Sequence, residues 1–182
     1  MMTRLTALDP ALATGKAKEL LDVVQASLGL TPNMTRTMAQ SPAVLEGYLS
    51  LSGALGRGNI TAKVREQIAL AVGEANHCQY CVSAHTAIGK RVGLSLDDIL
   101  ASRDAHGADP KTTAALTFAR LLVQNRGEVT DAEFNAVQMA GYTEGEIGEI
   151  VANVALNLFT NYFNHVAGTE VDFPKVELFA KA

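Results

Sequence analysis

The sequence has little of what marks several classes of protein. It has two cysteines, no tryptophan, six phenylalanines and four tyrosines, and it has no apolar run of about 18 residues. Its net charge is −4, and lysine and arginine form no block. A protein that binds nucleic acid needs a basic surface, so we expect neither nucleic acid nor a membrane among its partners. Two cysteines in 182 residues also exclude a small disulfide-stapled scaffold.

What is present fits one ordinary globular domain. Apolar residues make up 48% and charged residues 19% of the chain, close to the averages of globular proteins. At about 150 residues per domain, the length predicts a single all-helical domain over residues 1–182. Within it we expect a helical arm at 1–40 packed on a core at 41–170. The opening residues show no apolar segment before a small-residue cleavage site, so we expect a cytoplasmic protein.

Signals for the start of a helix recur along the chain and predict an all-α fold. Proline follows a capping residue at positions 9–10, 41–42 and 109–110, and the first of these predicts a helix from there to about Gly29. Thr61 opens a further apolar segment, and the cysteine segment after it closes at Gly93. Capping boxes are formed by Ser95 with Asp98, Thr130 with Glu133, and Thr143 with Glu146.

The last long helix is expected from about Glu144 to Ala167. It is apolar around so much of its circumference that we expect it to be a buried central helix. No convincing hairpin turn occurs, and β-branched residues alternate only near Thr169 to Val176.

The chemistry is concentrated in the pattern Cys78-x2-Cys81-x3-His85. If Cys78 begins a helix, 100° per residue places the three side chains on one narrow stripe. Cys81 and His85 are an i, i+4 pair, so the imidazole is near enough to take the thiol proton. Cys78 lies one turn away and can form a disulfide with Cys81. The pattern therefore supplies a nucleophile, a base and a second thiol.

A carboxylate would complete this set by orienting the imidazole. Glu66 could reach His85 if the helix before the cysteines packs antiparallel to theirs, and Glu74 is the competing candidate. The set suits attack on an O–O or S–S bond, because only the thiolate attacks and a free thiol is mostly protonated at neutral pH.

Glu66, Cys78, Cys81 and His85, at this spacing in a helical chain, resemble the alkylhydroperoxidase D-like group of the carboxymuconolactone decarboxylase superfamily. The resemblance covers about residues 40–170. It implies an all-α fold, trimers or hexamers, and thiol-dependent reduction of hydroperoxides or a related disulfide exchange. We expect an unidentified thiol or dithiol as reductant and no cofactor. The resemblance further implies Cys81 as peroxidatic cysteine, Cys78 as resolving cysteine, and Glu66 with His85 as proton relay.

One position departs from the family pattern. Tyr80 stands where well-studied members carry a second relay histidine, and a phenol is a poor base at neutral pH. The choice of attacking thiol is also contested, because a helix dipole favours Cys78 whereas the histidine spacing and the family favour Cys81. We expect Cys81 to attack.

Other interpretations of these residues stay open. Asn153, Asn157 and Asn161 form a polar stripe on the last helix, so Asn157, Asn161 and Tyr80 are candidate substrate contacts, although asparagines that tie helices together explain the stripe equally well. The cysteines and His85 could be buried packing residues or part of a zinc site, but one helix face cannot supply a tetrahedral shell. Covalent haem attachment is excluded because Val82, and not histidine, follows the second cysteine.

Two further functions compete with the peroxidase. The first is a non-redox decarboxylase-like enzyme, whose chemistry has no use for the dithiol. The second is a redox-sensing oligomer, in which a disulfide between Cys78 and Cys81 changes helix packing without catalysis. The apolar last helix predicts a homo-oligomer in either case.

Overall fold

Nine α-helices make up the secondary structure of residues 2–180, the part of the chain that this computed structural model describes, and no strand occurs among them. The helices are α1 (Gly15–Leu28), α2 (Asn33–Met38), α3 (Pro42–Leu55), α4 (Ala62–Ala75), α5 (Gln79–Arg91), α6 (Leu96–Arg103), α7 (Pro110–Gln124), α8 (Asp131–Met139) and α9 (Glu144–Ala167). The predicted all-α fold is confirmed. The predicted domain of 1–182 also includes residues 1, 181 and 182, which lie outside the described part.

The predicted capping signals define most helix starts. In each of the three capping boxes, the hydroxyl of Ser95, Thr130 or Thr143 accepts a hydrogen bond from a backbone N–H three residues later, and the acidic partner accepts one in return. The side chains of Thr61 and Asp109 cap α4 and α7 in the same way. Local sequence therefore fixes where these helices begin.

Two helix predictions were wrong at the start of the chain. The first helix begins at Gly15 and not at Pro10. The Asp9 carboxylate does accept a hydrogen bond from the N–H of Ala11, at 2.9 Å, but it closes only one turn. The backbone is then extended at Thr14, with a φ of −133° and a ψ of 164°, which ends this turn before α1 begins. Helix α2 was not predicted, because six residues are too short to show apolar periodicity.

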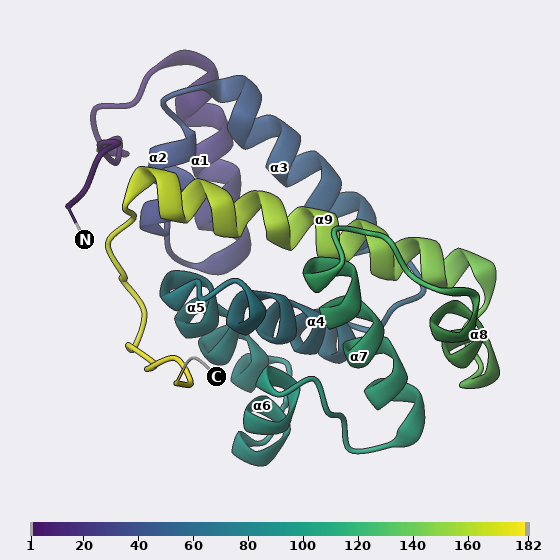
Figure 1. Ribbon diagram of the computed structural model, residues 1–182. Helices are drawn as coiled ribbons and strands as arrows, with labels where there is room; N and C mark the ends of the chain where they lie inside the picture. Colours follow the sequence, from purple (N-terminus) through teal and green to yellow (C-terminus); the bar gives the residue numbers. More distant parts are fainter. Residues whose placement is uncertain (1, 181–182) are drawn as a thin grey trace.

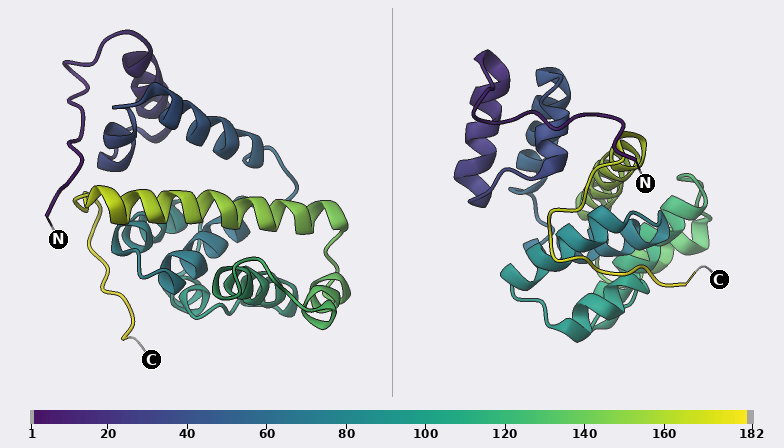
Figure 2. Two further views of the ribbon diagram at one scale, coloured as in Figure 1. Left: turned by 45° about the horizontal axis from the view of Figure 1, so that its top comes forward. Right: turned by 90° about the vertical axis from the view of Figure 1, so that its left-hand side faces the viewer.

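The helices stack in three tiers, with α9 in the middle. Figure 1 shows α1–α3 above α9 and α4–α7 below it, and the left view of Figure 2 shows the same separation. Helices α4 and α5 form an antiparallel pair joined by a short turn, and α9 packs against both of them. The N-terminal end of α5, where the cysteines lie, is therefore next to the C-terminal end of α9.

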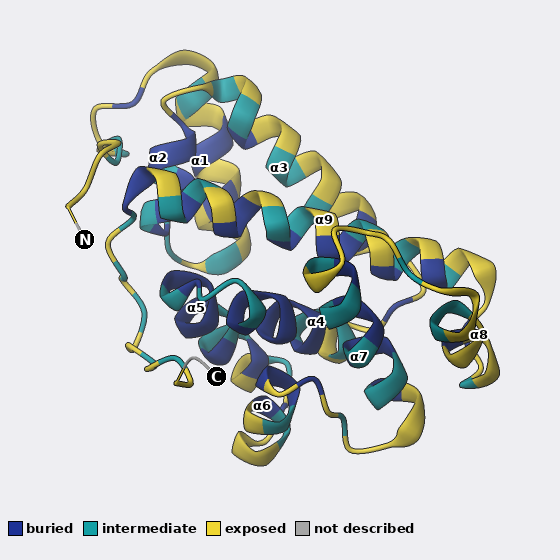
Figure 3. Ribbon diagram, in the orientation of Figure 1, coloured by how far each residue is buried: buried dark blue, intermediate teal, exposed yellow. Residues whose placement is uncertain are grey.

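The longest unbroken run of buried residues lies in α4, in which every residue from Gln67 to Glu74 is buried (Figure 3). The expectation of a fully buried α9 was only partly right. One face of α9 packs in the interior, but Val151, Phe159, Tyr162 and Val166 are exposed on the other. Part of the apolar surface of α9 is thus left uncovered by the rest of the same chain.

The N-terminal helices cover the cysteines. Apolar side chains of α1 and α2, including Leu21, Val24 and Met34, belong to one buried cluster with Cys78 and Cys81. A second cluster joins α4, α7, α8 and α9. The predicted arm is therefore in contact with the reactive segment.

After α9 the chain runs as an extended segment, residues 169–180, which we refer to as the strap. It forms no strand, although β-branched residues alternate along part of it. The Phe173 ring packs edge-on against Tyr80, with 5.8 Å between ring centroids. Further along, the N–H of Phe179 donates a 2.7 Å hydrogen bond to the Glu74 carboxylate, and its ring stacks on the Arg103 guanidinium. The strap thus closes over the start of α5.

Candidate active site

The turn between α4 and α5 positions the two cysteines. His77 has a φ of 53°, which reverses the chain directly before Cys78. Cys78 is the N-cap of α5, and its sulfur accepts a 3.4 Å hydrogen bond from the N–H of Cys81. The C-x2-C pair therefore lies at the start of a core helix, as predicted.

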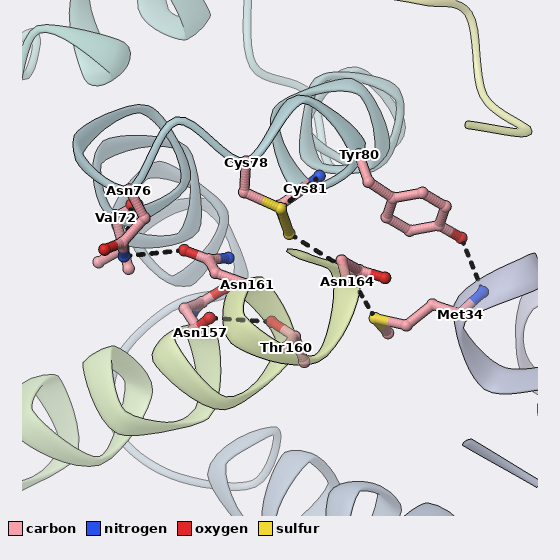
Figure 4. Close-up of a disulfide and its surroundings, with 10 residues drawn as sticks. All are labelled: Met34, Val72, Asn76, Cys78, Tyr80, Cys81, Asn157, Thr160, Asn161 and Asn164. Carbon is pink, nitrogen blue, oxygen red and sulfur yellow. Dashed lines mark hydrogen bonds between the residues drawn. A yellow bond between two sulfur atoms is a disulfide. The ribbon is translucent and has the colours of Figure 1, made fainter. Parts of the chain in front are cut away.

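Cys78 and Cys81 form a disulfide bond (Figure 4). Their Cα atoms are 5.3 Å apart, and each residue is only 2% exposed. Because the bond spans only two intervening residues, it closes almost no loop and stabilises the fold little. Its position suits a reactive pair better than a structural staple.

Glu66 is the carboxylate that contacts the histidine. Its Oε2 lies 2.7 Å from Nδ1 of His85, and both side chains are about four-fifths buried, with 18% and 22% exposed. The competing candidate, Glu74, forms a buried ion pair with Arg103 at 2.7 Å instead. A carboxylate on Nδ1 orients the ring and leaves Nε2 as the nitrogen that exchanges a proton with a third group.

A cavity of about 220 Å³, which we call the relay cavity, brings the reactive groups together. Cys81, His85 and Glu66 all line it, and Cys78 does not. Apart from Arg65, the remaining wall is apolar or uncharged: Leu28, Pro32, Met34, Thr35, Tyr48, Ser52, Leu55, Ala69, Tyr80, Ala84, Ile88, Asn153, Leu156, Asn157, Thr160 and Phe173. This space suits a small organic molecule.

The three candidate substrate contacts have different positions. Tyr80 and Asn157 line the relay cavity. Asn161 does not, because it is fully buried and its Oδ1 accepts a 2.9 Å hydrogen bond from the side chain of Asn76. Asn161 therefore ties α9 to the end of α4, which is the alternative explanation of the stripe.

Asn164 is a site residue that the sequence interpretation missed. Its amide donates hydrogen bonds of 3.3 Å to the sulfur of Cys81 and to the sulfur of Met34 (Figure 4). A donor aimed at sulfur favours the thiolate over the thiol. The signal was available, since Asn164 continues the polar stripe one helical turn beyond Asn161.

The two tyrosines of the cavity are neutral groups. Burial, above all, raises the pKa of Tyr80 far beyond its ordinary value, and the Tyr80 hydroxyl accepts a 3.2 Å hydrogen bond from the N–H of Met34. Burial and the nearby charge of Glu66 raise the pKa of Tyr48 to about 12. Neither phenol acts as a base at neutral pH, so neither replaces the second relay histidine of the family pattern.

Residues 2–180 hold neither a metal-binding cluster nor a helix that could cross a membrane. No group of three or more His, Cys, Asp or Glu side chains in this range is placed to hold a metal ion. None of the helices described is both long enough and apolar enough to cross a membrane.

Comparisons with known proteins agree with the fold and the motif. Residues 42–121, which include all four motif residues, match the sequence model of the Carboxymuconolactone decarboxylase family. An uncharacterized protein of Haemophilus influenzae is 47% identical over 47 residues, which are 25% of this chain and 42% of that protein. The match thus spans less than half the length of that curated relative.

Solved structures resemble the chain over almost its whole length. The alkylhydroperoxidase AhpD core of an uncharacterized peroxidase-related protein from Ralstonia eutropha has a TM-score of 0.84 at 25% identity, covering 94% of this chain and 93% of that one. The debrominase Bmp8, solved with 2,3,4-tribromopyrrole, has a TM-score of 0.81 at 22% identity, covering 94% and 93%. A peroxidase-related protein from Silicibacter has 0.79 at 21%, covering 92% of each chain. The last two similarities concern the fold alone.

Proposed function

We propose that the chain, whose residues 42–121 match the sequence model of the Carboxymuconolactone decarboxylase family, is a thiol-dependent hydroperoxide reductase. One observation carries the proposal: Cys81 and the Glu66–His85 pair line a single cavity. A thiolate source, a base with an oriented ring and space for an organic peroxide thus meet at one point.

The proposed reaction begins with the reduced dithiol. His85 takes the proton of Cys81, and the thiolate attacks the outer oxygen of the hydroperoxide. The O–O bond breaks, the alcohol leaves with the proton that His85 returns, and Cys81 becomes a sulfenic acid. The Cys78 thiolate then attacks this sulfur and displaces water. One hydroperoxide and two thiols thus yield an alcohol, water and the disulfide seen in the structure.

Three contacts support Cys81 as the attacking thiol. It lines the relay cavity, it lies one helical turn before His85, and it accepts the hydrogen bond of Asn164. Cys78 has the helix N-terminus in its favour, and this contact stabilises it as the attacking thiolate of the second step. The histidine spacing thus favours the thiol that attacks in the first step, and the helix dipole favours the thiol that attacks in the second.

The test is a stopped-flow oxidation of the reduced protein by cumene hydroperoxide, with thiol titration before and after. We expect the wild type to lose two thiols per peroxide, Cys81→Ser to lose the rapid reaction, and Cys78→Ser to stop at a sulfenic acid. His85→Ala should react at least about 10-fold more slowly. His106→Ala, at an exposed histidine outside the cavity, is the matched control and should react normally.

The proposal fails if the wild-type protein reacts no faster than free cysteine. The same instrument tests a second acceptor, suggested by the debrominase, because the relay cavity is of a size for a small brominated aromatic. In that reaction, two thiols and one C–Br bond would yield the disulfide, a C–H bond and hydrogen bromide. Bromide release from 2,3,4-tribromopyrrole without peroxide consumption would favour it.

The alternatives differ in turnover and in assembly. A redox sensor would be oxidised once without catalytic consumption of peroxide, and a decarboxylase-like enzyme would keep its activity in Cys78→Ser. We include homo-oligomerisation in the proposal, because Val151, Phe159, Tyr162 and Val166 leave an apolar stripe exposed on α9. Sedimentation of the wild type and of Tyr162→Glu measures this.

A further inference from the structure

A second cavity meets the disulfide at its other cysteine. It measures about 400 Å³, and we call it the Cys78 cavity because Cys78 lines it and Cys81 does not. The relay cavity has the opposite pattern, with Cys81 in its wall and without Cys78. Among the described residues, only Tyr80 lines both. The two ends of one S–S bond are therefore reached from two different spaces.

The walls of the two cavities differ in chemistry. The relay cavity is mostly apolar, whereas the Cys78 cavity has two imidazoles, those of His77 and His165, together with Gln79, Thr169 and Glu170. The hydroperoxide chemistry proposed above uses none of these groups.

His165 carries a buried nitrogen without a partner. Its Nε2 is shielded from solvent and has no hydrogen-bond partner among residues 2–180. Burial, and then the neighbouring imidazole of His77, lower the pKa of His165 below its ordinary value. The other charged groups near it are Glu170 in the cavity wall and Arg4, whose guanidinium donates to the backbone carbonyl of His165. The other ring nitrogen, Nδ1, is not shielded from solvent and makes no hydrogen bond within residues 2–180, so Nδ1 is the atom of this imidazole that is placed to accept a proton from a ligand in the Cys78 cavity.

We propose that the Cys78 cavity binds the reductant, a small polar thiol, and that His165 takes the proton of that thiol. This inference rests on the proposed redox cycle and names the partner of its second half. The incoming thiolate attacks the sulfur of Cys78, the Cys78–Cys81 bond breaks, and Cys81 leaves as a thiolate into the relay cavity. A second thiol attacks the sulfur of the bound reductant and releases Cys78. Two thiols become one disulfide, and the two protons end on Cys78 and Cys81.

The burial of Cys78 limits the size of this reductant, and the wall of the Cys78 cavity determines its polarity. Cys78 is 2% exposed, so the attacking sulfur must be carried inside on a slender molecule. The polar wall suits a thiol with amide, amino or carboxyl groups, which would not displace an apolar hydroperoxide from the relay cavity. Substrate and reductant therefore occupy separate sites and do not compete.

The first experiment locates the attack in the wild-type protein. The disulfide form is mixed with glutathione in the absence of peroxide, quenched with N-ethylmaleimide at short times, and mapped by peptide mass spectrometry. We expect glutathione on Cys78 and N-ethylmaleimide on Cys81. Glutathione on Cys81 would overturn the proposal. Because no peroxide is present, this result is independent of whether the protein reduces hydroperoxides.

The second experiment separates a base from a packing residue. His165→Asn should slow reduction by glutathione at pH 7 by at least about 10-fold, but should leave reduction by a phosphine at the wild-type rate, because a phosphine has no proton to lose. His106→Asn, the same change at an exposed histidine, is the matched control. Equal slowing with both reductants, or no slowing with glutathione, would refute the role of His165.

Discussion

Replacing Asn164 with leucine tests whether the chain stabilises a thiolate at Cys81. The two side chains have nearly the same size, so the change mainly removes the hydrogen bond of 3.3 Å to the sulfur. A hydrogen bond to a charged group contributes about 1.5–3 kcal/mol, and one pKa unit corresponds to about 1.4 kcal/mol. We therefore expect the pKa of the Cys81 thiol to rise by about 1–2 units.

The assay is alkylation of Cys81 by iodoacetamide from pH 5 to pH 10, in a Cys78→Ser background that leaves one thiol. Asn164→Leu should move the midpoint of the rate profile upward by about 1–2 units and raise the plateau at high pH by about 3-fold to 10-fold, because a more basic thiolate is more nucleophilic. Oxidation by hydroperoxide near pH 7 should slow by about 3-fold to 10-fold, because the loss of thiolate outweighs this gain.

A measurement of the Tm and a matched variant serve as controls for this result. Oδ1 of Asn164 is buried and has no partner within residues 2–180, so leucine removes an unsatisfied oxygen, and we expect a Tm close to that of the wild type. Asn157→Leu, on the same face of α9, removes an amide that donates to the carbonyl of Asn153 and touches no sulfur. A midpoint that moves equally in both variants, or in neither, would refute the reasoning.

Three further predictions concern stability and ionisation. Glu149 accepts hydrogen bonds from Asn59 and from the backbone N–H of Ile60, and these bonds lower the pKa of its carboxyl group. The stability that this carboxylate contributes to the fold is therefore present above about pH 4.5 and is lost as the pH falls through the lowered pKa. Glu149→Gln should therefore lower the Tm by several degrees at pH 7 and less at pH 3, by calorimetry. Glu74→Gln should cost about 3–5 kcal/mol in urea unfolding because it leaves the Arg103 charge buried alone, and Glu74→Gln with Arg103→Met should recover much of that loss. Absorbance at 295 nm should show that three of the four tyrosines stay largely un-ionised at pH 11, since burial, chiefly, raises the pKa of Tyr48 and of Tyr142 to about 12 and that of Tyr80 further. Stability present below pH 10 should be lost as the pH rises through 12.

Local signals were sufficient for the helices. Capping boxes and Asp-Pro or Ser-Pro starts act within four residues, so they can be recognised without knowledge of the rest of the chain. The helix at Glu144–Ala167 was predicted with the observed bounds for this reason. At Pro10 the same signal failed, because the backbone becomes extended at Thr14 after a single turn.

The site was predictable where its residues share one helix. The stripe of Cys78, Cys81 and His85 follows from spacing alone. Glu66 and Glu74 both lie on α4, and only the way in which α4 packs on its neighbours decides which one contacts the histidine. The contact between Asn164 and Cys81 joins positions 83 residues apart, and the pairing of Cys78 with His165 in one cavity arises from tertiary packing, which one sequence does not specify.

The strap gives this arrangement a further property. Residues 169–180 supply Phe173 to the wall of the relay cavity and Val171 to the wall of the Cys78 cavity, yet they contribute no reacting atom. An extended surface segment changes in sequence more freely than a buried helix does. Proteins with the same cysteine helix can therefore diversify their choice of peroxide and of thiol through a dozen residues that never take part in the chemistry.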